Sequence, residues 1–338
     1  MTDLSVDLRG YATLLDLGLE PFFVSCVHFA QLSGLFEHLA QPRTLTTFAT
    51  EKHLDAELLR RVCLVLVARG YLVSRDGDHW VLAEHLAPML LPSSPVFGGH
   101  PRDSVKSAPE YRAIEGALAR SNAETAAIFK QRWIEGEIAP DAALRQIEGM
   151  HRHIMAPMLA QVRSGVFEGL THVTDAGGGS GALAVALALH GAVGPKLTVL
   201  DLPPMCAASK RFRVEQGLPP VDTFPCNFFK DPWHDRGDAY HFSNILHDWS
   251  FELGEQLLGK AFAALPSGGK VIVHETLLAD DGKHHPATAA FHLLVGLHNR
   301  AQKYTLAQLR DSLVNVGFRA PKQVHTFGAY ATVVATKP

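Results

Sequence analysis

The chain has 338 residues, of which 47% are hydrophobic and 19% charged, proportions that are ordinary for a globular protein with a sizeable core. Its 31 basic and 34 acidic side chains give a formal net charge of −3, so the overall charge favours neither nucleic acid nor an anionic membrane as a partner. No apolar run of membrane-spanning length and no secretory signal are recognised, and the four cysteines are scattered. Together these features predict a cytoplasmic location.

The first hundred residues are expected to form helices followed by a small hairpin. Apolar residues at helical spacing predict a helix over residues 21–39 and two more within residues 44–70. Two short strands are expected at 71–73 and 79–82, joined by a turn whose Asp-Gly pair is a strong hairpin signal. Helices followed by such a hairpin are typical of a winged helix.

The remainder of the chain has a different pattern. We predict a winged-helix domain over 1–103 and a second domain over 104–338, whose first part, 104–165, is mostly helical and lines the substrate. His151 and His153 lie on that helical segment and are candidates to line a pocket. From Val173 onward, short apolar runs alternate with helical segments, which predicts an α/β fold whose mostly parallel sheet is covered by helices on both faces.

The strongest local signal is a glycine-rich loop at residues 175–181, Asp-Ala-Gly-Gly-Gly-Ser-Gly, between an apolar strand and the apolar helix 182–190. Glycine allows the sharp turn that such a loop needs, and without Cβ atoms a ligand can approach the backbone. Nucleotide-binding folds of many kinds use such a turn, and a tight turn without a ligand is the alternative interpretation. The loop therefore predicts a cofactor site without naming the cofactor.

A second signal for a cofactor is Asp201, which ends the next strand 26 positions after Asp175. An acidic side chain at that place can accept hydrogen bonds from both hydroxyl groups of a ribose. The same geometry suits a nicotinamide dinucleotide, so the loop and the aspartate together leave the cofactor open.

Five segments in a fixed order narrow that choice. They are DAGGGSG at 175–181, VLDLPP at 199–204, CNFFKDP at 226–232, NILHDWS at 244–250 and ALPSGGKVIVHETLL at 264–278. Together they resemble the S-adenosylmethionine-dependent methyltransferases related to plant caffeic acid O-methyltransferases and their bacterial relatives. The resemblance spans nearly the whole chain. It implies a Rossmann-like class I methyltransferase domain that acts on a small molecule, S-adenosylmethionine as cofactor, and a homodimer formed through the winged-helix region.

The family pattern also implies which residues bind the cofactor. Gly177 and Gly179 are expected beside its methionine part and Asp201 on its ribose. Asn227 and Phe228 are expected to flank the adenine; the family usually has Asp where Asn227 stands, and the amide still offers an acceptor oxygen. The full set predicted to bind the cofactor is Asp175, Gly177, Gly179, Asp201, Asn227, Phe228 and Ser243.

His247 stands where the O-methyltransferases of this family have their catalytic base. A neutral imidazole there would remove the proton of a phenol. The plant enzymes hold this histidine between two carboxylates; Glu275 matches one, whereas Lys303 stands in the segment that supplies the other. One hypothesis is therefore O-methylation without a metal, with His247 as general base and Glu275 beside it.

The departure at Lys303 favours a different chemistry. His247, Asp248 and His298 resemble the pattern of the 2-oxo acid C-methyltransferases of the phenylpyruvate type, and would offer two imidazoles and a carboxylate to iron, zinc, nickel or cobalt. The metal would stabilise the enolate of a 2-oxo acid, and Arg132 would pair with the substrate carboxylate. Metal-assisted C-methylation of the β-carbon is the preferred prediction, and O-methylation is the alternative.

Two other classes of protein deserve comparison with this interpretation. A winged helix joined to a ligand-binding domain is found in transcriptional regulators, but the helix that would enter DNA, residues 56–69, is largely apolar, which favours packing over DNA binding. A binding protein without catalytic activity is disfavoured because the glycine loop and Asp201 are both intact.

Overall fold

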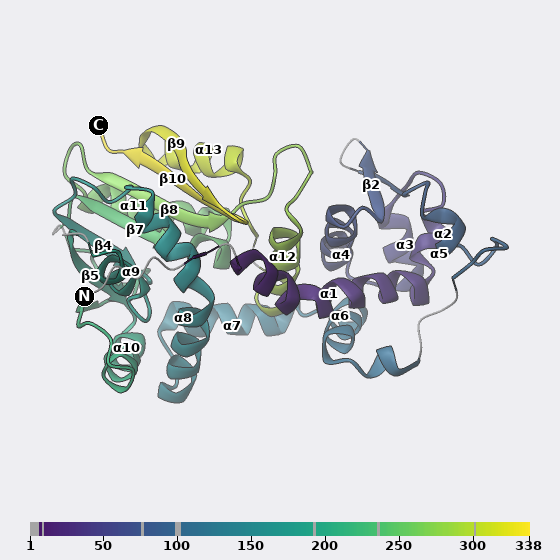
Figure 1. The fold of residues 1–338 in the computed structure, drawn as a ribbon, viewed down its shortest axis with the longest axis horizontal. Coiled ribbons are helices and arrows are strands. Elements are labelled where there is room, and N and C mark those ends of the chain that lie inside the picture. The colour runs from purple at the N-terminus through teal and green to yellow at the C-terminus, as the bar shows by residue number, and fades with distance from the viewer. Residues whose placement is uncertain are drawn as a thin grey trace. The chain divides into compact units, whose positions relative to one another are not determined.

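The computed structural model describes residues 7–8, 10–75, 78–98, 103–191, 194–234, 237–300 and 302–338. The chain forms two compact units, whose elements are drawn in Figure 1. Unit 1 is built from the residues up to Tyr11, from Ile128–Leu277 and from Gln302–Pro338, and unit 2 from Ala12–Ala127 and Leu278–Ala301. The units differ from the predicted boundary at residue 103, because residues 104–127 and the distant segment 278–301 both belong with the N-terminal residues.

Unit 2 is mostly helical and carries a three-stranded sheet with the order β1-β3-β2, which agrees with the predicted helical region and hairpin. The Asp-Gly pair of the predicted turn lies outside the described residues. Its strands are β1 (Arg43–Thr44), β2 (Leu72–Arg75) and β3 (His79–Leu82). Its helices are α1 (Tyr11–Ser33), α2 (Leu35–His38), α3 (Leu45–Lys52), α4 (Ala56–Ala68), α5 (Ala87–Leu90), the 3-10 helix η1 (Asp103–Ser107), α6 (Pro109–Arg120) and α12 (Pro286–His298).

Polar side chains attach the distant segment 278–301 to the rest of unit 2. Arg61, which is almost fully buried, donates from Nη1 to the carbonyl oxygen of His292 at 2.9 Å. The guanidinium of Arg300 pairs with Asp55 at 2.6 Å, across 245 positions of sequence. Contacts between residues so far apart leave no local signal, so a boundary drawn from loop composition misses them.

Among the described residues, one helix, α1, is long and apolar enough to cross a membrane by length and composition. The expectation that the sequence holds no such run is therefore wrong. The core helix of a soluble protein and a signal sequence pass the same test, so the finding is weak support for a membrane span. The absence of a membrane partner and the cytoplasmic location stay predictions.

Unit 1 is organised around a seven-stranded sheet with the order β6-β5-β4-β7-β8-β10-β9. Strand β10 runs antiparallel to both of its neighbours, and the other pairs are parallel. The predicted mostly parallel sheet is confirmed, with a short, exposed edge strand, β6, that the apolar pattern does not reveal. The strands are β4 (His172–Ala176), β5 (Lys196–Asp201), β6 (Asp222–Pro225), β7 (Ala239–Ser243), β8 (Lys270–Thr276), β9 (Arg319–Phe327) and β10 (Tyr330–Thr336).

Helices cover both faces of this sheet because the side chains of each strand alternate between the two faces. In β8, Val271 and Val273 join the core with α11 (Phe251–Ala264) and α13 (Leu306–Val316), whereas Ile272 joins the core with α8 and α9. The other helices in this part of the chain are α7 (Ala123–Glu135), α8 (Pro140–Arg163), α9 (Ala182–His190) and α10 (Pro203–Glu215), with a 3-10 turn η2 (Leu246–Asp248).

The order of the strands changes direction between β4 and β7. In parallel sheets, such a point leaves a crevice beside the carboxyl ends of the strands, where ligands bind. Asp175, Asp201, Ser243 and Glu275 all lie at those ends, and η2 directly follows β7. The fold thus gathers most of the predicted site residues at one edge of one sheet.

Candidate active site

The glycine loop connects β4 to α9 and takes conformations that side chains disfavour. Gly177 and Gly179 have φ values of 71° and 50°. A Cβ on Gly177 would also overlap the Cδ1 atom of Ile245, whereas a Cβ on Gly179 would meet nothing closer than 3.9 Å. The backbone therefore packs tightly at Gly177 and lies beside open space at Gly179, which leaves room for a ligand there.

Asp201 lies directly against this loop. The backbone N–H of Gly179 donates to its Oδ2 at 3.1 Å, and the N–H of Leu202 donates to its Oδ1 at 2.8 Å. Burial raises the pKa of Asp201 to about 7, although both N–H groups favour the carboxylate. Each carboxylate oxygen keeps acceptor capacity, so hydroxyl groups that donate to it would stabilise the charged form.

The two residues expected to flank adenine differ in what they do. The ring of Phe228 lies close to Gly177, and its centre is 5.7 Å from that of the tilted Trp233 ring. Asn227 is engaged in its own turn: its Oδ1 accepts from the N–H groups of Phe229 and Lys230, at 3.0 and 3.2 Å, and its Nδ2 donates to Ile134 at 2.8 Å. The acceptor oxygen that the sequence offered to adenine is thus already used by the backbone.

Asp175 and Ser243 contact buried histidines of the neighbouring strands. Asp175 is opposite His241 in the sheet, and its Oδ1 lies 2.7 Å from the histidine Nδ1. Ser243 is opposite His274, and its Oγ lies 3.0 Å from that Nδ1. Burial holds the pKa of His274 well below its usual value, and this histidine is therefore uncharged in the folded protein.

His247 and Glu275 form the closest pair of titratable groups at this edge. The histidine Nδ1 lies 2.6 Å from Glu275 Oε2, while Oε1 accepts from the N–H groups of Ile245 and Leu246 at 2.9 and 3.1 Å. Burial would raise the pKa of Glu275, but His247 and then Lys303 outweigh it and hold that pKa below its usual value. Because Nδ1 donates to the carboxylate, the Nε2 of a neutral His247 keeps its lone pair.

Lys303 brings an ammonium group into the same buried cluster. The side chain is 3% exposed, and its Nζ donates to Thr276 Oγ1 at 2.6 Å, next to Glu275 in β8. Burial lowers the pKa of Lys303, while Glu275 and Asp248 favour its charged form. The structure therefore has a cation where the resemblance implied a second carboxylate.

The predicted metal centre is not supported. No group of three or more His, Cys, Asp or Glu side chains among the described residues is arranged to hold a metal ion. Asp248 is 43% exposed and lies 3.7 Å from His247 Nε2, and His298 belongs to unit 2, where its Nδ1 lies 2.8 Å from a carbonyl of its own helix. The three residue types match the C-methyltransferase pattern, but that match does not determine the positions of their side chains.

Arg132, the predicted partner of a substrate carboxylate, is exposed on α7. Two further groups lie beside the His247 turn, Asn244 and Tyr330, and neither was predicted from the sequence. Asn244 Nδ2 donates to the Tyr330 hydroxyl at 3.1 Å, across 86 positions. The sequence near His247 gave one indication of this contact: Asn244 is a polar residue between the end of β7 and the His-Asp pair at 247–248.

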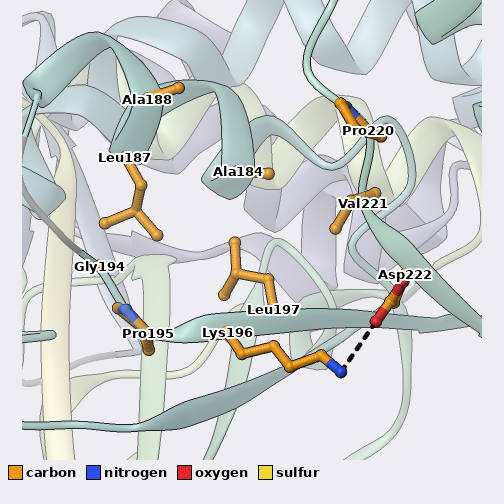
Figure 2. A pocket seen from close by; sticks show the side chains of 10 residues that line it. All are labelled: Ala184, Leu187, Ala188, Gly194, Pro195, Lys196, Leu197, Pro220, Val221 and Asp222. Atoms are coloured by element: carbon orange, nitrogen blue, oxygen red, sulfur yellow. Dashed lines mark ion pairs between the residues drawn. The ribbon is translucent and has the colours of Figure 1, made fainter.

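A separate hollow of about 390 Å³ lies in unit 1 (Figure 2). It is lined by side chains of α9 and by the starts of β5 and β6, where Lys196 and Asp222 pair at 3.2 Å. The starts of these parallel strands lie at the opposite edge of the sheet from Asp201. None of the predicted site residues lines this hollow.

Comparison with known proteins identifies the family of this chain. Residues 130–319 match the family model of the O-methyltransferase domain. The chain is 33% identical over 301 residues to 3-hydroxy-5-methyl-1-naphthoate 3-O-methyltransferase of Streptomyces sahachiroi, covering 84% of this chain and 83% of that protein. It is 32% identical over 166 residues to acetylserotonin O-methyltransferase of Bos taurus, covering 49% and 47% of the two chains.

Among solved structures, an O-methyltransferase family 2 protein from Planctomyces limnophilus, in complex with apigenin, superimposes with a TM-score of 0.76. The alignment covers 99% of this chain and 97% of that one at 19% identity, which shows the fold alone.

The family match and the curated relatives show that the protein is an S-adenosylmethionine-dependent methyltransferase, and the helix-covered, mostly parallel sheet agrees with this class. The matched residues make up more than half of the chain, and the chain belongs to the O-methyltransferase family related to the caffeic acid enzymes. This confirms the broader resemblance. The similarity to 2-oxo acid C-methyltransferases is not shown, and the matched relatives favour O-methylation, the alternative, over C-methylation.

Proposed function

We propose that the protein transfers a methyl group to a hydroxyl group of a small aromatic molecule, with His247 as the general base. The observation that carries this proposal is the contact of His247 Nδ1 with Glu275, which orients the imidazole with Nε2 directed away from the carboxylate. The two curated relatives support the acceptor class, since one is named for a hydroxynaphthoate and the other for acetylserotonin.

The residues at the carboxyl edge of the sheet suit S-adenosylmethionine. Open space at Gly179 would receive the methionine part, the buried Asp201 carboxylate would accept from the ribose hydroxyls, and Phe228 would pack on the adenine. When bound, this cofactor supplies a sulfonium methyl whose carbon–sulfur bond breaks as the acceptor oxygen bonds to the carbon, leaving the electron pair on sulfur.

His247 Nε2 receives the proton of the acceptor hydroxyl in the same step, which makes the oxygen a stronger nucleophile. The imidazole becomes positively charged, and the ionised Glu275 at 2.6 Å stabilises that charge. The hydrogen bond from His247 and the nearby Lys303 keep Glu275 ionised in its buried position, so the carboxylate is already charged before the reaction begins.

The test is an assay of cofactor consumption with a panel of phenols and 2-oxo acids, with and without a strong chelator, and with the product located by proton NMR. We expect a methoxy singlet on a phenol that is indifferent to the chelator. His247→Ala should lower kcat by about 10²–10⁴, the usual contribution of a general base, while exposed His190→Ala should change nothing. A methyl doublet on the carbon beside an oxo-acid carbonyl, lost on chelation, would overturn the proposal.

We further propose a homodimer formed through unit 2. Leu14 and Leu17, both 70% exposed, and Val24, 42% exposed, lie on one face of α1 at helical spacing and form an apolar surface. Sedimentation should show a dimer, and the double variant Leu14→Glu, Leu17→Glu should sediment as a monomer. A wild-type monomer at micromolar concentration would contradict this assembly.

A further inference from the structure

The turn that carries His247 begins at a residue in a disfavoured backbone conformation. Asn244 follows β7 directly, is 8% exposed and has a φ of 56°, in the left-handed region that few side chains other than Asn and Asp adopt. The next residue, Ile245, packs its Cδ1 against the Gly177 backbone, and η2 with His247 follows. The conformation at Asn244 therefore sets the direction of the whole turn.

A chain of hydrogen bonds reaches Asn244 from two distant elements. Its Nδ2 donates to the hydroxyl of Tyr330, the first residue of β10, at 3.1 Å. That hydroxyl lies 2.8 Å from Nε2 of His153 on α8. A tyrosine hydroxyl can accept and donate at once, so it can accept from Asn244 and donate its one hydrogen to His153.

This direction requires that His153 accept at Nε2 and therefore be neutral. Burial, together with the smaller effects of the neighbouring Lys303 and His247, lowers the pKa of His153 to about 4. At neutral pH the imidazole is thus uncharged and can accept the Tyr330 hydrogen. Tyr330 is 1% exposed, and its ring packs 4.8 Å from that of His274, so the hydroxyl has a fixed place.

We propose that His153 and Tyr330 are positioning residues that hold Asn244 in its left-handed conformation and so aim His247 at the acceptor. Neither residue needs to touch the acceptor or the cofactor. Glu275 holds the turn from one side through the N–H groups of Ile245 and Leu246, and the Asn244–Tyr330–His153 chain holds its start. The inference rests on the proposed role of His247.

Tyr330→Phe is the sharpest test because it removes one oxygen and keeps the packed ring. Without the hydroxyl, the buried Asn244 amide and His153 Nε2 both lose a partner, and the turn becomes free to adopt other conformations. We expect kcat to fall about tenfold, with the Kd for S-adenosylhomocysteine in calorimetry changed less than threefold, because Asp201 and Gly179 have no contact with the chain of hydrogen bonds. Tyr111→Phe, which removes the hydroxyl of another buried tyrosine, bonded to Glu115 in unit 2, should leave both values unchanged.

Two further pairs of variants separate positioning from packing. His153→Gln retains a carbonyl oxygen that can accept from Tyr330 and should recover part of the activity that His153→Leu loses. Glycine at position 244 lacks the amide but adopts the left-handed backbone easily. Alanine lacks the amide and also disfavours that backbone, so Asn244→Ala should be less active than Asn244→Gly.

A nitrogen-15 NMR spectrum of the histidine rings tests the hydrogen bond without any activity measurement. The Nε2 signal of His153 should shift when Tyr330 becomes phenylalanine. If that shift occurs while His247→Ala stays fully active, the role of His247 fails and the hydrogen bonds stand. If Tyr330→Phe keeps the wild-type kcat, or if kcat, cofactor affinity and melting temperature all fall together, the positioning role is overturned.

Discussion

The glycine loop and the His247 turn follow neighbouring strands of one sheet, yet different kinds of contact hold them. The loop is held by backbone hydrogen bonds and by side chains that lie no more than 33 positions away: Gly177 N–H donates to the carbonyl of Leu200 at 2.7 Å, and the side chains of Asp201 and Arg213 bond to Gly179 and Ser180. The His247 turn is held mainly by side chains from β8, β10 and α8.

This difference separates the two halves of the proposed site: the cofactor half, which is the glycine loop with Asp201, and the acceptor half, which is the His247 turn with Glu275. The loop keeps its shape through φ values that a few glycines permit, so a short stretch of sequence is enough to predict a cofactor site there. A turn held by side chains depends on residues far away, and small changes in those residues should alter the chemical step more than cofactor binding. Four predictions test this separation, in order of decreasing effect.

The largest effect is expected for Glu275→Gln. An amide can accept from the Ile245 and Leu246 N–H groups, but it cannot stabilise a positively charged His247. We expect kcat to fall about 100-fold or more, with the Kd for S-adenosylhomocysteine nearly unchanged by calorimetry. An equal loss of cofactor affinity would show that the two halves are not separate.

Gly177→Ala should damage the cofactor half instead. The new Cβ would overlap Ile245 and take a φ of 71°, which costs about 1–2 kcal/mol by itself, so cofactor affinity should fall about tenfold or more. Gly191→Ala provides a matched control, since its φ is 73° but no atom lies within 4 Å. Adding Ile245→Ala to Gly177→Ala should restore part of the affinity; no recovery would mean that the overlap is not the cause.

Cofactor affinity should also depend on pH through Asp201. Its folded pKa of about 7 lies above the ordinary 3.8, so the free protein retains this proton between about pH 4 and 7 and loses stability as pH rises across that range. Ribose hydroxyls donate to the carboxylate form, so binding releases the proton and the Kd for S-adenosylhomocysteine should fall severalfold from pH 6 to 8. Asp201→Asn should bind more weakly with no such slope, and a slope that persists would assign it to another group.

The smallest effect is expected for Asn227→Asp, which introduces the residue usual in the family. The carboxylate would still accept from Phe229 and Lys230, but it would lose the bond to Ile134 and face a carbonyl oxygen instead. We expect a loss of about 1 kcal/mol in stability, measured as a melting temperature lower by a few degrees, and no gain in cofactor affinity. Tighter cofactor binding would return this position to adenine recognition.

The geometry of the proposed cofactor site was largely predictable from the sequence. The glycines of the loop can be identified directly in the segment 175–181, and Asp201 ends a strand that the apolar pattern predicts. Because the two strands are neighbours in the sheet, the loop and Asp201 lie side by side. Asn227 shows the limit of that approach. Its residue type is compatible with adenine recognition, but the N–H groups of the following two residues occupy its oxygen.

The acceptor half was readable only in part. His247 and Glu275 followed from the resemblance, and the structure brings them together at 2.6 Å. The metal prediction was not supported, because it inferred a cluster from residue types whose side chains lie on separate elements. Lys303 was noticed as a departure, but its bond to Thr276 could not be foreseen.

The sequence by itself determined the parallel sheet covered by helices, the helical N-terminal region, the glycine loop and the methyltransferase family. These features depend on apolar periodicity and turn chemistry, which act over about ten residues and can be read along the chain. The tertiary structure alone decided the attachment of residues 278–301 to unit 2, the burial of Lys303 and the support of Asn244 by Tyr330 and His153. Those contacts join positions up to 245 residues apart, and only the packed fold brings their donors and acceptors within hydrogen-bonding distance.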